Sequence, residues 1–410
     1  MTNLFPDALN TDLVARATSH YTPNYRQTPL FLVRGEGVWV WDRDGKRYLD
    51  FIAGIAVNSV GHAHPRLVAA IREQADAVIH VSNLYYNEPA LALLDKLGEI
   101  SFADRVYFGN SGTEANEAAL KLARRYQTRV KNAPEKTGVL AFDHSFHGRT
   151  YASISVTGQP KYHDGFEPMM AGVHFARFGD LDHVVSTIAG AGGTIGTVIV
   201  EPVQCEGGLN MPPPGFLKGL RKVCDQHGIV LIYDEVQTGV GRCAEWWYYE
   251  IDAVRPDILT SAKGIGGGVP LGAMLCTDEV AQGWGPGSHA STFGGNPLAT
   301  RAGLEVLRII EDEQLLDNAY KVGEALGEGL EALAKRHPEK VADPRGVGLL
   351  RGLRVRDEAA AGRVVEAARE RGLLLNTVRG GVLRMVPPLI VQKGHVDAAL
   401  EILDEVLAAS

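Results

Sequence analysis

Short apolar segments alternate with amphipathic segments between about residue 65 and about residue 290. The apolar segments are typical of strands that are buried on both faces, because no polar positions interrupt them. The segments between them repeat apolar residues at helical spacing. This alternation predicts an α/β fold with a mostly parallel sheet covered by helices. The predicted strands are Arg105 to Phe108, Val139 to Phe142, Thr197 to Val200, Ile229 to Tyr233 and Ile258 to Thr260.

The two ends of the chain show other patterns. Residues 35–51 predict a hairpin that turns at Asp44-Gly45, and Pro65 begins a helix, because proline is tolerated in a first turn. Beyond Asn296 a long helical stretch precedes a compact α+β pattern. We therefore expect an N-terminal segment that contributes to a small domain, a large domain, and a C-terminal small α+β domain, with the boundaries 1–60, 61–297 and 298–410.

Composition limits the class of partner. The 410 residues are 45% hydrophobic and 22% charged, as in globular domains. A net charge of -8, without basic blocks, argues against a nucleic-acid surface. No apolar run approaches the roughly 20 residues of a membrane span, and MTNLFPDALN lacks the features of a signal peptide. The four cysteines form no metal or redox motif, so we expect reduced thiols in a cytoplasmic protein.

Charged residues follow two of the predicted strands. Asp234 and Glu235 come directly after the strand that ends at Tyr233, and Lys263 follows the strand that ends at Thr260. Ligands of open α/β sheets bind at the carboxyl ends of the strands. The glycines of SAKGIGGGVPLGA allow close backbone approach beside Lys263. The alternative is that these acids and this lysine only face water.

The turn in YFGNSGTEANEAALKLARR joins a strand to a predicted helix at 113–127. Free N–H groups and the dipole at a helix start favour an anion, and Ser111 and Thr113 add hydroxyl donors. Either hydroxyl could instead only cap the helix. The stretch GIGGGV is no dinucleotide fingerprint, because it lacks the third glycine and leads into Val-Pro. The histidines of GHAHP have no further ligands nearby, so no metal site is expected.

One cofactor requires all three of these features together. In pyridoxal 5′-phosphate the phosphate binds at a helix start, the aldehyde forms a Schiff base with a lysine, and the ring nitrogen pairs with an acid. Asp234 is the candidate for the acid, because a carboxylate there would keep the ring nitrogen protonated. Lys263 is the candidate for the lysine. The sequence therefore predicts a pyridoxal-phosphate site.

The sequence resembles the class III aminotransferases of fold type I, and within them most closely those that act on acetylornithine. In that family a smaller α+β domain is formed by both chain ends. The resemblance covers nearly the whole chain and rests on FLVRGEGVWVWDRDGKRYLDFIAGIAVNSVGHAHP, SGTEANEAALKLAR, FHGRT, EPVQCEGG, YDEVQTGVGR, SAKGIGGGVPLGA, STFGGNP and VLRMVPPL.

The resemblance implies a role for each cofactor residue. Lys263 would hold the cofactor and then move the proton between the substrate carbon and the cofactor. Thr292 would reach the phosphate bound in the partner subunit, so a homodimer with shared active sites is implied. The other implied cofactor-binding residues are Ser111, Gly112 and Thr113 at the phosphate, Phe146 and Val236 on the two ring faces, Gln237 at the ring hydroxyl, and Asp234 with its neighbour Glu235.

The resemblance also implies how substrates bind. Arg149 would take the carboxylate remote from the reacting amine, and Arg384 would take the α-carboxylate of 2-oxoglutarate, since guanidinium binds carboxylate bidentately. Glu206 would mask Arg384 while an ω-amino donor is bound. Relatives usually carry glycine where EPVQCEGG has Cys205, so we expect this loop to lie differently. Tyr25 and Ser291 are further candidate donor contacts.

The function implied is transfer of the δ-amino group of N2-acetylornithine to 2-oxoglutarate, which gives N-acetylglutamate 5-semialdehyde and glutamate in arginine biosynthesis. Succinyl-diaminopimelate is a second candidate donor. Ornithine, succinylornithine, 4-aminobutyrate and a carrier-bound lysine remain as alternatives. An aminomutase of the glutamate-1-semialdehyde type would need no 2-oxoglutarate. A binding module without activity is disfavoured, because Lys263, Asp234 and Gln237 are all present.

Overall fold

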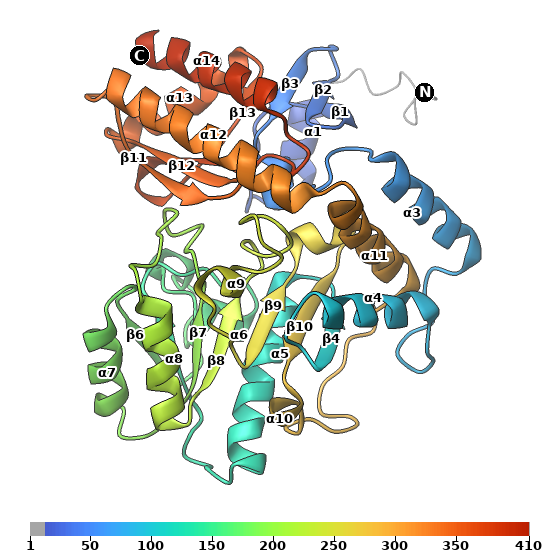
Figure 1. Cartoon of the computed structure of the whole chain (residues 1–410), viewed down its shortest axis with the longest axis vertical. Helices are drawn as coiled ribbons and strands as arrows, with labels where there is room; N and C mark the ends of the chain where they lie inside the picture. Colours follow the sequence, from blue (N-terminus) through green and yellow to red (C-terminus); the bar gives the residue numbers. More distant parts are fainter. Residues whose placement is uncertain (1–12, 410) are drawn as a thin grey trace.

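The computed structural model describes residues 13–409. A seven-stranded sheet forms the centre of the large domain, in the order β4-β10-β9-β8-β7-β5-β6 (Figure 1). Strand β10 runs antiparallel to β4 and β9, and the other neighbours are parallel, which confirms the mostly parallel sheet. The strands are β4 (Arg105–Gly109), β5 (Gly138–Phe142), β6 (Val173–Ala176), β7 (Ile195–Val200), β8 (Val230–Asp234), β9 (Ile258–Ser261) and β10 (Gly272–Cys276).

Both faces of this sheet are covered by helices. Helix α5 (Gly112–Arg125) packs on one face, and α7 (Leu181–Gly190) and α8 (Phe216–His227) pack on the other. Because side chains alternate along a strand, Val230 and Ile232 of β8 join the core under α5, whereas Leu231 and Tyr233 join the core under α8. The apolar run of β8 therefore needs no polar position until Asp234.

A smaller domain lies at one end of the large sheet and is built from both ends of the chain (Figure 1). Strand β3 pairs in parallel with β13, so the predicted hairpin is joined to the C-terminal region. One sheet has the order β1 (Leu32–Glu36), β2 (Trp39–Asp42), β3 (Arg47–Asp50), β13 (Leu373–Leu374); the other has β11 (Val341–Val347), β12 (Leu350–Val355), β15 (Val382–Met385), β14 (Asn376–Val378). The helices of this domain are α12 (Leu315–Arg336), α13 (Glu358–Glu370) and α14 (Lys393–Ala409).

Two differences between the structure and the predicted elements have a local cause, and strands β6 and β11 were also not predicted. The long helical stretch after Asn296 is two helices, because Gln314 between them adopts a left-handed conformation with φ of 53°. Strand β10 was not predicted, since it lies in a glycine-rich segment. None of the helices within residues 13–409 is long and apolar enough to cross a membrane. The remaining helices are α1 (Leu13–His20), α2 (Ala53–Ala56), α3 (Pro65–Ala77), α4 (Glu88–Glu99), α6 (Tyr151–Ser155), α9 (Tyr248–Asp252), α10 (Asp278–Ala281) and α11 (Pro297–Asp312).

A buried arginine joins the two domains. Arg242, in the loop after β8, is 2% exposed, and its Nη1 donates to the backbone oxygens of Leu349 (3.0 Å) and Pro387 (2.6 Å) in the small domain. Its Nε and Nη2 atoms have no hydrogen-bond partner among residues 13–409. Burial lowers the pKa of Arg242 to about 10. The turn at Gly348 lies directly against this loop, where a Cβ atom would come within 2.7 Å of the Cys243 carbonyl carbon.

Two helical glycines give a matched test of packing on the small domain. A Cβ at Gly323 in α12 would lie 2.2 Å from the Gly348 carbonyl oxygen, whereas a Cβ at Gly362 in α13 would meet nothing within 4 Å. We expect Gly323→Ala to lower the free energy of unfolding by roughly 1–3 kcal/mol through overpacking. Gly362→Ala should raise it by roughly 0.5–1 kcal/mol, because alanine favours helix. Denaturant unfolding of both variants checks this, and equal effects would contradict it.

Candidate active site

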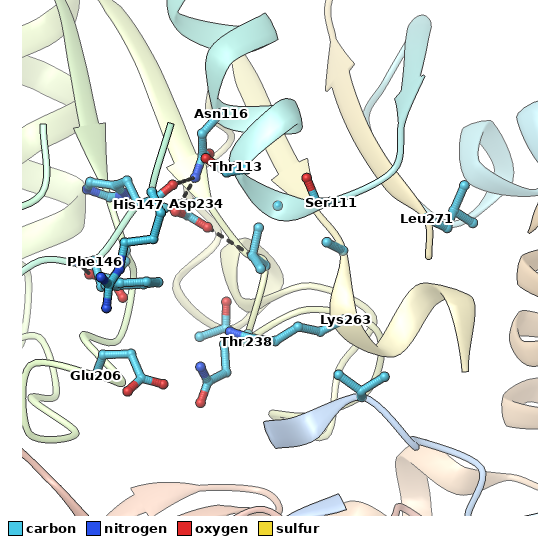
Figure 2. A pocket seen from close by; sticks show the side chains of 18 of the residues that line it. Ser111, Thr113, Asn116, Phe146, His147, Glu206, Asp234, Thr238, Lys263 and Leu271 are labelled. Carbon is cyan, nitrogen blue, oxygen red and sulfur yellow. Dashed lines mark hydrogen bonds and ion pairs between the residues drawn. The ribbon is translucent and has the colours of Figure 1, made fainter. Parts of the chain in front are cut away.

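A cavity of about 460 Å³ opens at the carboxyl ends of β7, β8 and β9. Figure 2 shows side chains from the sheet, from the start of α5 and from the loop after β5 pointing toward it. The structure thus brings together most of the residues that the sequence singled out. Those that line the cavity are Ser111, Gly112, Thr113, Phe146, Arg149, Glu206, Asp234, Val236, Gln237 and Lys263.

Asp234 is a buried carboxylate held by three donors. Because it continues the face of Val230 and Ile232, its side chain lies on the side covered by α5. Its Oδ2 accepts hydrogen bonds from Asn116 Nδ2 (2.8 Å) and His147 Nδ1 (2.8 Å), as Figure 2 shows. Its Oδ1 accepts a hydrogen bond from the Val236 amide (3.1 Å). These donors offset the loss of hydration and keep the carboxylate fixed at the cavity wall.

Asn116 and His147 were missed in the sequence. Asn116 lies in α5, and its Oδ1 accepts a hydrogen bond from Thr260 Oγ1 of β9 (2.7 Å) while its Nδ2 also donates to the His147 carbonyl (2.7 Å). One amide therefore ties α5 to β8, β9 and the loop after β5. A signal was present, because an asparagine among the buried alanines of α5 is an unusual polar residue on a core-facing side.

Lys263 follows β9 and begins a short 3₁₀ turn, Lys263–Gly266. Its φ of 46° is a left-handed conformation that non-glycine residues seldom adopt, and such strain is common at functional sites. Its Nζ has no hydrogen bond or ion pair to any residue within 13–409. The amine is therefore available to a bound molecule.

The start of α5 forms the opposite wall of the cavity. Ser111 is the N-cap of the helix, and its Oγ accepts a hydrogen bond from the Glu114 amide (3.3 Å). This hydroxyl therefore caps the helix, as the alternative interpretation expected. The amides of Gly112 and Thr113 belong to the first turn, whose N–H groups have no partner within a helix. A Cβ at Gly112 would lie 2.8 Å from Val236 Cγ1, so this position admits no side chain without a shift. The wall suits an anion.

Glu201 is a second buried carboxyl at the cavity that the sequence reasoning missed. It follows β7 as Asp234 ends β8, so the same signal would have found it. One oxygen, Oε2, accepts from the Phe146 amide (2.8 Å). Burial, and after it the charge of Asp234, raises the pKa of Glu201 well above its ordinary value. The uncharged form of Glu201 is therefore favoured relative to that of a free glutamate.

Arg384 comes from β15 of the small domain and is 1% exposed. Its Nη1 donates to a Glu206 carboxylate oxygen and to Gln237 Oε1 (2.9 Å), and its Nε donates to Asn376 (3.3 Å). Burial alone would raise the pKa of Glu206, but Arg384 and Lys263 outweigh it and hold that pKa below its ordinary value. The pair is thus ionised, and Glu206 and Gln237 both accept hydrogen bonds from Arg384 Nη1.

Five of the predicted residues do not line the cavity in the described chain, and Arg384 of β15 is one of them. Glu235 is fully buried behind it, where its carboxylate accepts from the amides of Tyr248 (2.6 Å) and Tyr249 (3.1 Å) at the start of α9. Tyr25 lines a separate surface groove of the N-terminal segment. Ser291 and Thr292 lie in a neighbouring surface depression.

Two smaller expectations can be compared with the structure. Cys205 is buried and does not adopt a positive φ, so its side chain fits the loop without the strain expected for it, and burial raises the pKa of its thiol. Its neighbours Gly208 and Leu209 carry the left-handed conformations instead. His62 pairs with Asp50 (2.8 Å), and residues 13–409 contain no cluster of His, Cys, Asp or Glu that could hold a metal ion.

Comparison with known proteins decides the family. The family described as aminotransferase class-III matches residues 20–407. The chain belongs to the class III aminotransferases. It is 46% identical over 384 residues to the acetylornithine aminotransferase of Caldanaerobacter subterraneus subsp. tengcongensis, with 94% of this chain and 96% of that protein covered. It is also 46% identical over 386 residues to the acetylornithine aminotransferase of Aquifex aeolicus, covering 94% and 98%.

Solved structures of this class have the same fold. The ornithine aminotransferase of Toxoplasma gondii superposes with a TM-score of 0.94 at 32% identity, over 98% of this chain and 97% of that one. The acetylornithine aminotransferase of Elizabethkingia anophelis superposes with a TM-score of 0.86 at 31% identity, over 97% and 98%. This class III aminotransferase therefore has the fold type I architecture that the sequence predicted.

Class III aminotransferases act with pyridoxal 5′-phosphate, and the cavity suits that group. It offers an anion-binding helix start, an amine without a partner and a fixed carboxylate, which are the chemical complements of a phosphate, an aldehyde and a pyridine nitrogen. The residues that would hold the cofactor are Ser111 to Thr113, Lys263 and Asp234. Phe146 and Val236 lie on the cavity wall as candidates for the two ring faces.

Burial raises the pKa of Glu235 to about 7, against 4.5 for a free glutamate. Because the folded state holds this proton more tightly, the stability it confers is complete below about pH 4.5 and is lost as the pH rises through 7. We expect the free energy of unfolding, relative to Glu235→Gln, to fall by roughly 3 kcal/mol between pH 4.5 and 8. Denaturant unfolding across this range checks it, and a pH-independent difference would contradict it.

Proposed function

We propose that this class III aminotransferase acts in the cytoplasm on N2-acetylornithine as amino donor and 2-oxoglutarate as acceptor, as a step of arginine biosynthesis. The observation that carries the proposal is that the site combines a free lysine, Lys263, with two arginines, of which one is paired with an acid and the other is not. Arg149 forms no ion pair within the described residues, and Arg384 is masked by Glu206. A donor with one carboxylate and an acceptor with two fit this arrangement.

The donor is oriented by its carboxylate. Arg149 binds it bidentately at the cavity mouth, which directs the δ-amino group toward Lys263. The acetylated α-amino group of the donor carries no charge, so the cavity does not have to supply an acid to pair with it. Glu206 stays on Arg384 during this half of the cycle, because otherwise the guanidinium would be buried without a counter-charge.

Proton movement is assigned to residues of this chain. When bound, pyridoxal phosphate supplies the aldehyde that accepts the amino group and a ring that delocalises negative charge. Lys263 Nζ takes the proton from the δ-carbon of the donor and would deliver it to the cofactor carbon that carried the aldehyde, since no residue within 13–409 holds this amine. Asp234, fixed by Asn116 and His147, would pair with the ring nitrogen of the cofactor.

The acceptor uses the same cavity with one change. The second carboxylate of 2-oxoglutarate displaces Glu206 from Arg384, and Arg384 keeps a counter-charge throughout. Arg149 binds the remote carboxylate as before. One cavity thus accepts a monocarboxylate donor and a dicarboxylate acceptor, because a carboxylate of the protein substitutes for the missing one.

We further propose a homodimer in which Thr292 completes the cavity of the partner. Leu84 is 83% exposed and Tyr86 is 93% exposed, although both are apolar. Asn83 Nδ2 donates to the carbonyls of Ser291 (2.8 Å) and Gly294 (3.0 Å), which joins this segment to the loop of Thr292. An exposed apolar surface of this kind is typical of an interaction site, and the loop of Thr292 is hydrogen-bonded to the same segment.

The donor assignment is tested by single turnover. We expect N2-acetylornithine to change the absorption of the bound cofactor faster than ornithine or 4-aminobutyrate does, by at least about tenfold, since one pocket rejects an unmatched charge. Glutamate should appear only when 2-oxoglutarate is added. Lys263→Ala should lower turnover by a factor of at least roughly 10³ through loss of the proton-transferring amine. Faster reaction with another donor would overturn the assignment, and turnover without 2-oxoglutarate would indicate an aminomutase.

The dimer is tested by sedimentation. We expect Tyr86→Asp to shift the protein to the mass of a single chain and to lower its activity at least roughly tenfold, because a charge in an apolar interface opposes association. Tyr320→Asp is the matched control, since Tyr320 on α12 is also 60% exposed but lies on the small domain. A wild-type protein that sediments as a single chain would contradict the proposal.

A further inference from the structure

Arg149 is held by aromatic rings and not by an acid. Its guanidinium carbon lies 4.0 Å from the centroid of the Tyr162 ring and 5.6 Å from that of Phe146. The two rings contact each other edge to face, with centroids 5.8 Å apart and an interplanar angle of 75°. Within residues 13–409 the side chain of Arg149 makes no hydrogen bond or ion pair. The contact with Tyr162 is therefore its closest restraint.

Ring stacking and ion pairing differ in whether they leave the N–H edge of the guanidinium free to bind a ligand. A carboxylate partner would occupy the N–H edge of the guanidinium, as Glu206 does for Arg384. A ring under the guanidinium plane uses only the face and leaves the N–H edge open for a bound carboxylate. It also removes part of the rotamer freedom of a long side chain, which otherwise opposes binding. Tyr162 therefore holds Arg149 in place and keeps it able to bind.

Tyr162 is itself well fixed. It ends the 3₁₀ turn Pro160–Tyr162, where its amide donates to the Gln159 carbonyl (3.0 Å). The buried Gln159 donates from Nε2 to the carbonyl of Ser145 (3.1 Å), one residue before Phe146. The turn that carries the ring is thus bonded to the segment that carries Phe146 and Arg149. Movement of one relative to the other is restricted.

We propose that Tyr162 is a positioning residue that fixes the carboxylate-binding site of Arg149 relative to Lys263, and thereby sets the length of the amino donor. This inference rests on the proposed role of Arg149 in binding the remote carboxylate. The neighbouring Lys161 has its Nζ 4.8 Å from the centroid of the same ring and forms no ion pair within the described chain. It adds positive charge at the same place without fixing the guanidinium.

The test compares variants of the holoenzyme. Tyr162→Phe keeps the aromatic face, Tyr162→Leu and Tyr162→Met remove it with little change in bulk, and Lys161→Gln removes only the neighbouring charge. Melting midpoints identify which aliphatic variant folds as the wild type does. Two quantities are measured: the affinity for glutarate by calorimetry, and single-turnover rates with ω-amino acids of four to six carbons and with alkylamines of the same lengths.

We expect the aliphatic variants to bind glutarate about tenfold more weakly and to lose the preference for one donor length, with alkylamine rates unchanged. Tyr162→Phe should stay within about twofold of the wild type. Lys161→Gln should weaken glutarate binding at low salt but keep the length preference, because it changes charge and not position.

Three other results would separate the inference from the proposed function. An unchanged glutarate affinity and length preference in the aliphatic variants would overturn the inference and leave the proposed function standing. A wild type that treats ω-amino acids and alkylamines alike would overturn both, since Arg149 would then bind no carboxylate. A wild type that prefers a different carboxylated donor, with that preference lost in the aliphatic variants, would support the inference and overturn only the proposed donor.

Discussion

The buried carboxylate of Asp234 is the constraint on which the rest of the site depends. A carboxylate at the end of an apolar strand is stable only when donors replace its water. Those donors come from α5 and from the loop after β5, so satisfying Asp234 also places the start of α5 and the segment of Phe146 at the cavity. The start of α5 and the segment of Phe146, which are proposed to face the phosphate and the ring, are therefore positioned by the same hydrogen bonds that hold the carboxylate at the strand end.

The charges of the cavity are balanced unevenly, and this favours anionic ligands. Burial disfavours the charged form of Glu201, and Glu206 is paired with Arg384. Lys263 and Arg149 then outnumber Asp234, the one further acidic residue that lines the cavity in the described chain. A phosphate and a substrate carboxylate would enter a region of positive potential. In the proposed cycle Glu206 differs from the other acids, because it leaves Arg384 when the carboxylate of the acceptor arrives.

The sequence predicted the sheet, the strand-end carboxylate and lysine, and the helix start, because each depends on local periodicity. It did not predict β10, since glycine obscured the strand pattern, or the role of Asn116, which becomes evident only when α5 lies over β8. Glu235 follows Asp234 directly, yet alternation along the chain turns it away from the cavity to cap α9. Tyr25 and Thr292 lie outside the cavity of the described chain, and their proposed roles cannot be read from local periodicity.

The loop after β8 joins the two domains. It follows directly after Asp234, and Arg242 within it anchors the small domain through two backbone oxygens. Pulling the domains apart would expose these oxygens and break the packing of Gly348 against the same loop. Since that loop is continuous with the strand that ends at Asp234, disruption of the joint would act directly on the centre of the large sheet. We therefore expect loss of the contact between the domains to destabilise both cores.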